Sequence, residues 1–377
     1  MTTGDRRRVP LPWATLLVFA AIGTLLGTGL ALLDLHRTHE INGGLVHTRP
    51  GSPAAPLLAA DLPEEPQSIR GDHDGQQFYA VARDPLDLDV AVESLDRPRY
   101  RLQHPLFAWL SWLVHPGGRG STLVWTMFAV NVAGVLVGSL AMGALSCTLR
   151  GPPFLAVVFG VLPGVVMSLR ITVADSLAVA LMLLVIVLFL RGHDVLAAIV
   201  AVAAVLTKEP MLIAFVGVAL WSRQRRSLLI VVPPIVVAGL WFAYLHARVV
   251  AGGDQVVEFG LPLAGMVSSV RLWLTGSDSY AMASMVLALA LGAVALVQRR
   301  LRHPLGLALL FELGFLLVLK LDVIGLERNG TRMTLPVMVL AIVMIATPHG
   351  ADPGSGAGQT VDDRGHRVDG VATQADV

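Results

Sequence analysis

Long apolar segments constrain this chain more than any other feature. The first runs from Leu11 to Leu33, and the whole sequence is 54% hydrophobic with only 15% charged residues and a mean hydropathy of +0.68. A transmembrane helix needs about 20 mostly apolar residues, and one soluble core cannot hide so much apolar surface. The sequence therefore predicts an all-α, polytopic integral membrane protein.

Hydropathy predicts about ten transmembrane helices. After Leu11–Leu33, spans are expected at 121–146, 153–169, 172–190, 195–207, 210–221, 228–249, 280–297, 304–325 and 333–347. The first segment exceeds the 7–15 residues of a signal-peptide core and precedes no convincing cleavage site, so we expect it to be retained. The transmembrane domain covers residues 1–349. Residues 350–377, rich in Gly, Asp, Gln and Ala, are expected to form a disordered cytoplasmic tail.

Arginine clusters set the expected orientation in the cytoplasmic (plasma) membrane. They fall on alternate loops, which the positive-inside rule places in the cytoplasm together with both termini. The loops at 35–120, 170–171, 208–209, 250–279 and 326–332 then face outward. Segment 104–116 has His-Pro at both ends and two tryptophans. Its length favours an interfacial helix in the large first outer loop, whereas a span there would reverse every later helix.

The ionisable residues of the outer face form mixed groups of acids and bases. These groups are Arg170 with Asp175, Lys208 with Glu209, and Glu327-Arg328 with Arg332. Residues at helix ends often only anchor the bundle, through snorkelling and surface pairing. Cations around a carboxylate also suit a substrate that bears a phosphate, because Arg forks onto phosphate oxygens and Lys supplies a point charge.

The first outer loop contains a carboxylate-rich segment, Gly71-Asp72-His73-Asp74-Gly75, followed by Gln76-Gln77-Phe78-Tyr79. If its backbone is locally extended, Asp72 and Asp74 point to the same side and can line one cleft. The glycines allow tight turns around this pair. Asp-Gly is also a common turn sequence, so the residues alone leave both a turn and a proton-transfer site open.

The order of these features resembles the GT-C superfamily of membrane glycosyltransferases. Segment 74–79, with Ala82-Arg83-Asp84-Pro85, is similar to the acidic first-loop motif of that superfamily, and most to a bacterial subset that reads roughly Tyr-Asp-Gly-Gln-Phe-Tyr. His73 stands where that subset often has Tyr, and a Gln pair replaces its usual single Gln. The resemblance covers about residues 10–348, with further matches in the stretches 104–110, 172–176, 206–209 and 327–336.

The resemblance implies transfer of a sugar from a polyprenyl-phosphate donor to an acceptor in the cell envelope, outside the cytoplasmic membrane: a glycan, a lipid or a protein. Asp74 is then expected to act as general base, with Asp72 in reserve. The residues expected to bind the donor phosphate are Lys208, Arg328, Arg332 and Arg170, in that order. The residues expected to contact substrate or to orient these cations are Gln76, Gln77, Tyr79, Asp175, Glu209 and Glu327.

Other chemistries are weighed against this expectation. Asp72, His73, Asp74 and His104 could be drawn as metal ligands, but no His-x3-His or paired-Cys pattern exists, so either no cofactor or a divalent cation is compatible with the sequence. No Walker-type loop and no basic-aromatic surface occurs, which disfavours ATP-driven transport and nucleic-acid binding. A transporter or lipid-linked-glycan flippase, with Glu312 deep in a span, and a non-catalytic assembly partner are the alternatives.

Overall fold

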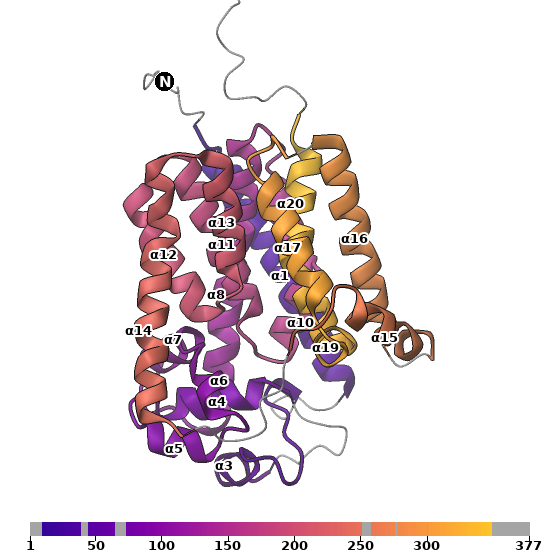
Figure 1. Cartoon of the computed structure of the whole chain (residues 1–377). Helices are drawn as coiled ribbons and strands as arrows, with labels where there is room; N and C mark the ends of the chain where they lie inside the picture. The colour runs from indigo at the N-terminus through magenta and orange to yellow at the C-terminus, as the bar shows by residue number, and fades with distance from the viewer. Residues whose placement is uncertain are drawn as a thin grey trace, which may run out of the picture.

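The structure is a computed structural model that describes residues 10–38, 44–64, 73–250, 258–275, 278–299 and 301–348. Asp72 and the expected tail lie outside the described residues. Within them the regular secondary structure is helical, apart from one isolated β-bridge between Phe259 and Leu319. The helices stand side by side as an upright bundle (Figure 1). The expectation of an all-α protein is confirmed.

In the described chain, four helices are long and apolar enough to cross a membrane. They are α1 (Trp13–Thr38), α8 (Gly120–Thr148), the continuous pair η1 (Arg225–Ile230) and α14 (Val232–Arg248), and α16 (Ser279–Arg299). A fifth results if α19 (Glu327–Met333) and α20 (Leu335–Ala346), bent by 40°, form one span. Shorter apolar helices are α11 (Asp175–Leu190), α12 (Asp194–Thr207), α13 (Met211–Ser222) and α17 (Gly306–Val318). This architecture is compatible with a helical membrane protein, whereas the expected count of about ten spans is not confirmed.

Breaks within apolar runs explain part of this difference. The span expected at 153–169 divides into α9 (Leu155–Val161) and α10 (Pro163–Arg170) at Leu162, whose backbone is extended at φ −63° and ψ 139°. Pro163 has no N–H to donate and disfavours a helical residue before it. The span expected at 304–325 likewise ends at Val318, and the short α18 (Leu321–Ile324) follows. Apolar composition thus continues through positions at which the helix does not.

The core lies around α11, which packs between α8, α12 and α13. Its side chains are apolar on every side, which is the pattern of a fully enclosed helix. At the edge of the bundle α1 packs against α9 through glycines. A Cβ on Gly27 would lie 2.1 Å from the carbonyl oxygen of Gly160, so only glycine allows this approach.

The helices of the first loop gather at one end of the bundle, and the described ends of the chain lie at the other (Figure 1). They are α3 (Ala55–Asp61), α4 (Gly75–Arg83), α5 (Leu88–Glu93), α6 (Pro98–Leu102) and α7 (Leu106–Val114). Helix α7, the core of segment 104–116, has nine residues and packs on α4 and α8. At about 1.5 Å per residue it is too short to cross about 30 Å of hydrocarbon. α15 (Ala264–Leu274) lies beside the lower end of α16.

Candidate functional site

Asp74 lies immediately before α4, as its N-terminal cap residue, with φ −61° and ψ −19°. Its backbone is thus helical and not extended. The next residue must be glycine, because a Cβ on Gly75 would lie 2.4 Å from the carbonyl oxygen of Ile171. On the other side, the His73 ring accepts a hydrogen bond from the Gly75 N–H at 3.3 Å and contacts the carbonyl of Gly44 at 3.2 Å. These contacts fix the position of the Asp74 side chain.

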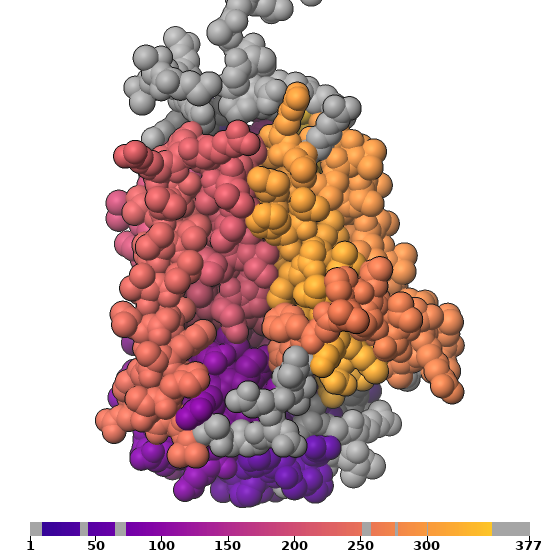
Figure 2. Space-filling view, in the orientation of Figure 1, coloured from indigo at the N-terminus to yellow at the C-terminus, as the bar shows by residue number. Residues whose placement is uncertain are grey.

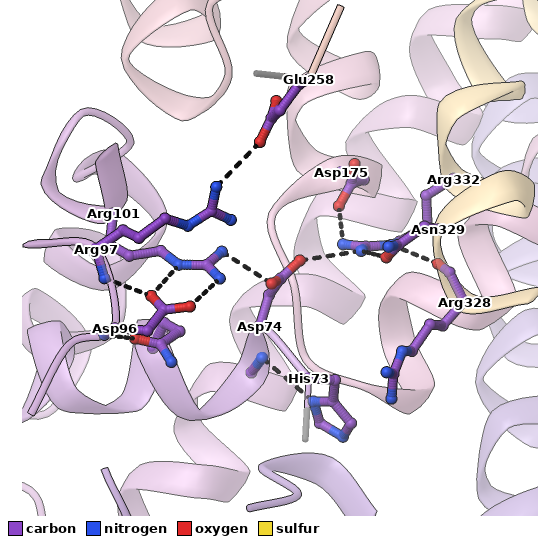
Figure 3. A network of polar contacts seen from close by, with 12 residues as sticks. His73, Asp74, Asp96, Arg97, Arg101, Asp175, Glu258, Arg328, Asn329 and Arg332 are labelled. Atoms are coloured by element: carbon purple, nitrogen blue, oxygen red, sulfur yellow. Dashed lines mark hydrogen bonds and ion pairs between the residues drawn. The ribbon is translucent and has the colours of Figure 1, made fainter. Parts of the chain in front are cut away.

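Two arginines from distant parts of the chain hold the Asp74 carboxylate. Arg101, in α6, donates from Nη1 to Oδ1 at 2.8 Å, and Arg332, in α19, donates from Nη2 to Oδ2 at 3.0 Å. Figure 3 shows Asp74 between these two guanidinium groups. Arg101 is itself held by Asp96 through a forked contact at 2.8 and 2.9 Å. Both oxygens of Asp74 therefore accept charged hydrogen bonds.

The network continues from Arg332 to a second carboxylate at the start of α11. Arg332 donates from Nη1 to Oδ2 of Asp175 at 2.8 Å, and Lys208 binds the other oxygen of Asp175. The side chains of Arg332 and Asp175 are only 4% and 6% exposed. We call Asp74, Arg101, Asp175, Lys208 and Arg332 the ion cluster. It joins α4, α6, α11, α19 and the turn after α12.

The electrostatic consequence for Asp74 is strong. Burial by itself raises the pKa of a carboxyl group, but Arg101 and then Arg332 outweigh burial and hold the pKa of Asp74 well below its usual range. The pKa of the adjacent His73 is also lowered, to about 3, by burial and then by the nearby His47. Asp74 is therefore an ionised carboxylate and His73 a neutral imidazole near neutral pH.

A cavity of about 990 Å³ opens at the ion cluster. One end is polar and contains Asp74, Arg101, Lys208 and Arg332. The other end is apolar and is lined by residues of α13 and α17, among them Leu212, Ile213, Val216, Leu310, Phe311 and Phe315. In Figure 2 the red part of the chain, which includes α13, meets the orange-to-yellow part, which includes α17, along a seam. The cavity thus joins a charged end to an apolar wall.

A histidine and a glutamate form a second pair in the same cavity. His104 Nε2 contacts the carboxylate of Glu209. The ring of Tyr100 meets the His104 ring edge-on, with centroids 5.5 Å apart. All three residues line the cavity, and His104 holds the pKa of Glu209 below its usual range against the opposing effect of burial. Glu209 therefore contacts a histidine and not the ion cluster directly.

Five residues expected near the phosphate or substrate line neither this cavity nor a smaller one next to Asp74: Arg170, Arg328, Glu327 and, in α4, Gln76 and Tyr79. Arg170 pairs with Asp34 of α1 at 2.5 Å. The Arg328 carbonyl accepts from Arg332 at 2.6 Å, but its guanidinium points away from Asp175, toward the side of His73 (Figure 3). Glu327 is the first residue of α19, and its N–H donates to Oδ1 of Asp278 at 3.0 Å. Sequence reasoning could not separate these from Arg332.

The polar residues of α4 divide between packing and the site. Gln76 is 1% exposed and accepts from Ser52 Oγ at 2.8 Å. Tyr79 is fully buried and donates to Asp61 at 2.9 Å. Gln77 accepts from a backbone N–H at 3.4 Å and lines the smaller cavity beside Asp74. Because α4 begins directly after Asp74, residues 76 and 79 share its inward face.

Arg101 is the main site residue that the sequence analysis did not single out. A usable signal exists, because Arg97-Pro-Arg99-Tyr-Arg101 places three arginines within five residues of a loop that the sequence analysis expects to face outward. Outer loops are normally poor in arginine. Such an excess beside an acidic motif marks cations that serve another purpose than topology.

No protein-family model, curated protein or solved structure matches this chain. What the site can do therefore follows from its own geometry. Within the described residues, no group of three or more His, Cys, Asp and Glu side chains could hold a metal ion. Arg332 and its neighbours already occupy the oxygens of Asp74 and Asp175 that a metal would need. The arrangement is instead suited to binding an anion and to moving a proton.

Proposed function

We propose that this chain is a membrane glycosyltransferase that moves a sugar from a polyprenyl-phosphate donor to an acceptor in the cell envelope, on the outer side of the cytoplasmic membrane. The observation that carries the proposal is the cavity with the ion cluster at one end and the apolar wall of α13 and α17 at the other. A polyprenyl phosphate has the same two parts, an anionic head and an apolar tail. The GT-C resemblance of the first-loop motif points to the same substrate class.

In this proposal three cations bind the donor phosphate and stabilise it as a leaving group. Arg101 and Arg332 can each present a fork of N–H donors, and Lys208 adds a compact charge at the same cavity end. The phosphate keeps its negative charge when the bond to the sugar breaks, so preorganised cations lower the barrier. Arg170 and Arg328 line neither cavity and are left outside this phosphate site.

Asp74 is the proposed general base, and its ion pairs with Arg101 and Arg332 must break before it can accept a proton. A carboxylate whose pKa is held far down is a poor base. The three carboxylates Asp74, Asp96 and Asp175 balance the three cations Arg101, Lys208 and Arg332, so an incoming phosphate competes with Asp74 for them. Once released, Asp74 takes the proton of the acceptor hydroxyl as that oxygen attacks the anomeric carbon.

Transport of the same amphiphile is the second candidate, and one observation favours it. Glu312 lies in α17, the helix that supplies the apolar wall, and is 2% exposed. Its Oε1 is buried without a hydrogen-bond partner in the described part of the chain. An ionisable residue at such a position is typical of ion- or proton-coupled transport.

Radiolabelled transfer separates these two functions. Purified full-length protein in lipid bilayers is given undecaprenyl phosphates that carry labelled glucose, mannose or arabinose. The label is then followed into acceptors of an envelope extract, which reports transfer, or into free sugar, which reports hydrolysis by water. We expect transfer by wild type and a loss on the order of 10²-fold or more in Asp74→Asn, with donor binding retained. The control is Asp89→Asn, an exposed acid of the same loop. Movement of intact donor across the bilayer without transfer favours transport, and equal transfer by Asp74→Asn removes Asp74 from the mechanism.

A further inference from the structure

A second, smaller cavity lies against Asp74. Its volume is about 40 Å³, and its polar lining includes Asp74, Gln77, Tyr100 and His104. A water molecule needs about 10–15 Å³ of such volume and two or more polar partners. This cavity has room and partners for a water between the carboxylate of Asp74 and the imidazole of His104.

His104 links the two cavities. It lines both, whereas Glu209 lines only the large one. The side chain of His104 is 10% exposed and that of Glu209 is 37% exposed, so the pair runs from a closed chamber to an open one. The path from Asp74 through His104 to Glu209 therefore leads outward.

The contacts of the imidazole leave one nitrogen available. Nε2 faces the Glu209 carboxylate, so when the ring carries a single proton this contact places it on Nε2. Nδ1 is then an acceptor, and it has no hydrogen-bond partner among the residues that the structure describes. Besides Glu209, the charged residues that line one or both cavities are Asp74, Arg97, Arg101, Asp175, Lys208, Glu258, Asp322 and Arg332.

The proposed reaction creates a need for this path. A donor in the large cavity covers the direct route from Asp74 to solvent, because Asp74 lines that cavity. The ion cluster re-forms after transfer only when Asp74 gives up its proton, since a neutral carboxyl cannot balance Arg101 and Arg332. A proton acceptor in contact with the small cavity meets this need.

We propose that His104, held by Glu209, receives through the small cavity the proton that Asp74 takes from the acceptor hydroxyl, an inference that rests on the function proposed above. The acceptor oxygen bonds to the anomeric carbon while the phosphate leaves with the electron pair of the broken bond. The hydroxyl proton goes to Asp74 and then to Nδ1 of His104. The Nε2 proton leaves toward Glu209 and the open cavity. Imidazole is the side chain best suited to such a relay near neutral pH.

Chemical rescue tests the relay. Full-length wild type and His104→Ala are assayed in lipid with undecaprenyl phosphates that carry labelled glucose, mannose or arabinose, with and without added imidazole. We expect His104→Ala to bind donor normally, to lose transfer on the order of 10²-fold, and to regain much of it with imidazole. His246→Ala, which alters an exposed histidine of α14 outside both cavities, is the matched control. Its rate of transfer should equal that of wild type and should not change when imidazole is added.

The possible results are distinct. Full activity of His104→Ala, or a loss that imidazole does not restore in a variant with unchanged thermal unfolding, overturns the relay while the glycosyltransferase function stands. If His104→Ala does not fold, His104→Asn, which keeps a polar contact to Glu209, is measured by the same rescue criterion. Absence of transfer and hydrolysis in wild type overturns the proposed function, and the relay with it.

Discussion

Two of the groups of ion pairs at the first-loop end of the bundle differ in what surrounds them. Asp34 and Arg170 join α1 to α10 as one pair, with side chains 46% and 33% exposed. Arg332 is 4% exposed and holds Asp74 and Asp175 together. Desolvating charges is costly unless several partners compensate, so a buried group of this kind needs a network. A charged helix end becomes a candidate site where several elements converge on a cavity.

Replacement of Arg332 should have the largest effect, and it tests whether the two groups of ion pairs differ in their contribution to stability. Arg332→Met leaves the buried Asp175 and the partly exposed Asp74 without their shared partner, and we expect a loss of about 3–5 kcal/mol in unfolding free energy together with loss of transfer. Arg170→Met should cost only about 0–1 kcal/mol, because its pair is partly exposed. Unfolding in detergent measures both. Equal losses would show that the two groups are energetically alike.

A substitution of Arg101 tests the role of a single cation of the ion cluster. In the proposed mechanism it faces the phosphate, so Arg101→Gln should lower transfer about 10²–10³-fold through weaker stabilisation of the leaving group. The matched control is Arg99→Gln, which alters a neighbour in α6 that donates to the Val249 carbonyl and lines neither cavity. Transfer rates at saturating donor measure the effect. A rate near wild type in Arg101→Gln would place the phosphate elsewhere.

The pH dependence of stability should reveal the ion pairs that Asp74 forms with Arg101 and Arg332. Its folded pKa lies below the unfolded value of 3.8, so its ion pairs stabilise the fold above that value and the contribution is lost as pH falls further. The stability difference between wild type and Asp74→Asn should therefore be constant from neutral pH to about pH 5 and shrink below about pH 4. Thermal unfolding at a series of pH values tests this. A difference that already shrinks near pH 6 would contradict the lowered pKa of Asp74 in the folded protein.

Chelation should have the smallest effect. The oxygens of Asp74 and Asp175 accept from the chain's own cations, which supply the charge that a divalent ion would bring. We expect transfer to be unchanged by EDTA, as measured in the labelled-donor assay. Loss of activity that added Mg²⁺ or Mn²⁺ restores would show that a metal displaces these cations during the reaction.

The sequence predicted the uninterrupted helices well. The spans expected at 121–146 and 280–297 correspond to α8 and α16, whereas the span expected at 228–249, which contains Pro233 and Pro234, is divided between η1 and α14. Long apolar runs without proline leave the backbone no alternative to a helix in lipid. The break at Leu162 was missed because apolar composition is the same on either side of it. Hydropathy reports solvent preference and carries little information about where hydrogen bonding is interrupted.

The sequence analysis named several residues that the structure brings close together. Asp175, Lys208 and Arg332 were expected at outward helix ends, and the structure brings them together beside Asp74. Arg101 lies in a loop helix of five residues, where no periodicity reports tertiary contacts. The inward orientation of the Tyr79 side chain depends on where α4 begins. Its hydrogen-bond partner, Asp61, lies in a separate helix. Long-range pairing of this kind is decided by packing and not by local pattern.

The order of the cluster along the chain has a consequence for biogenesis. Asp74 emerges early in synthesis, Asp175 and Lys208 follow in the middle, and Arg332 emerges after nearly all of the described chain. A nascent chain that stops before α19 already carries the acid but lacks the cation that joins its two carboxylates. Assembly of the cluster therefore coincides with insertion of the last helices, and an incompletely made protein cannot present the finished site.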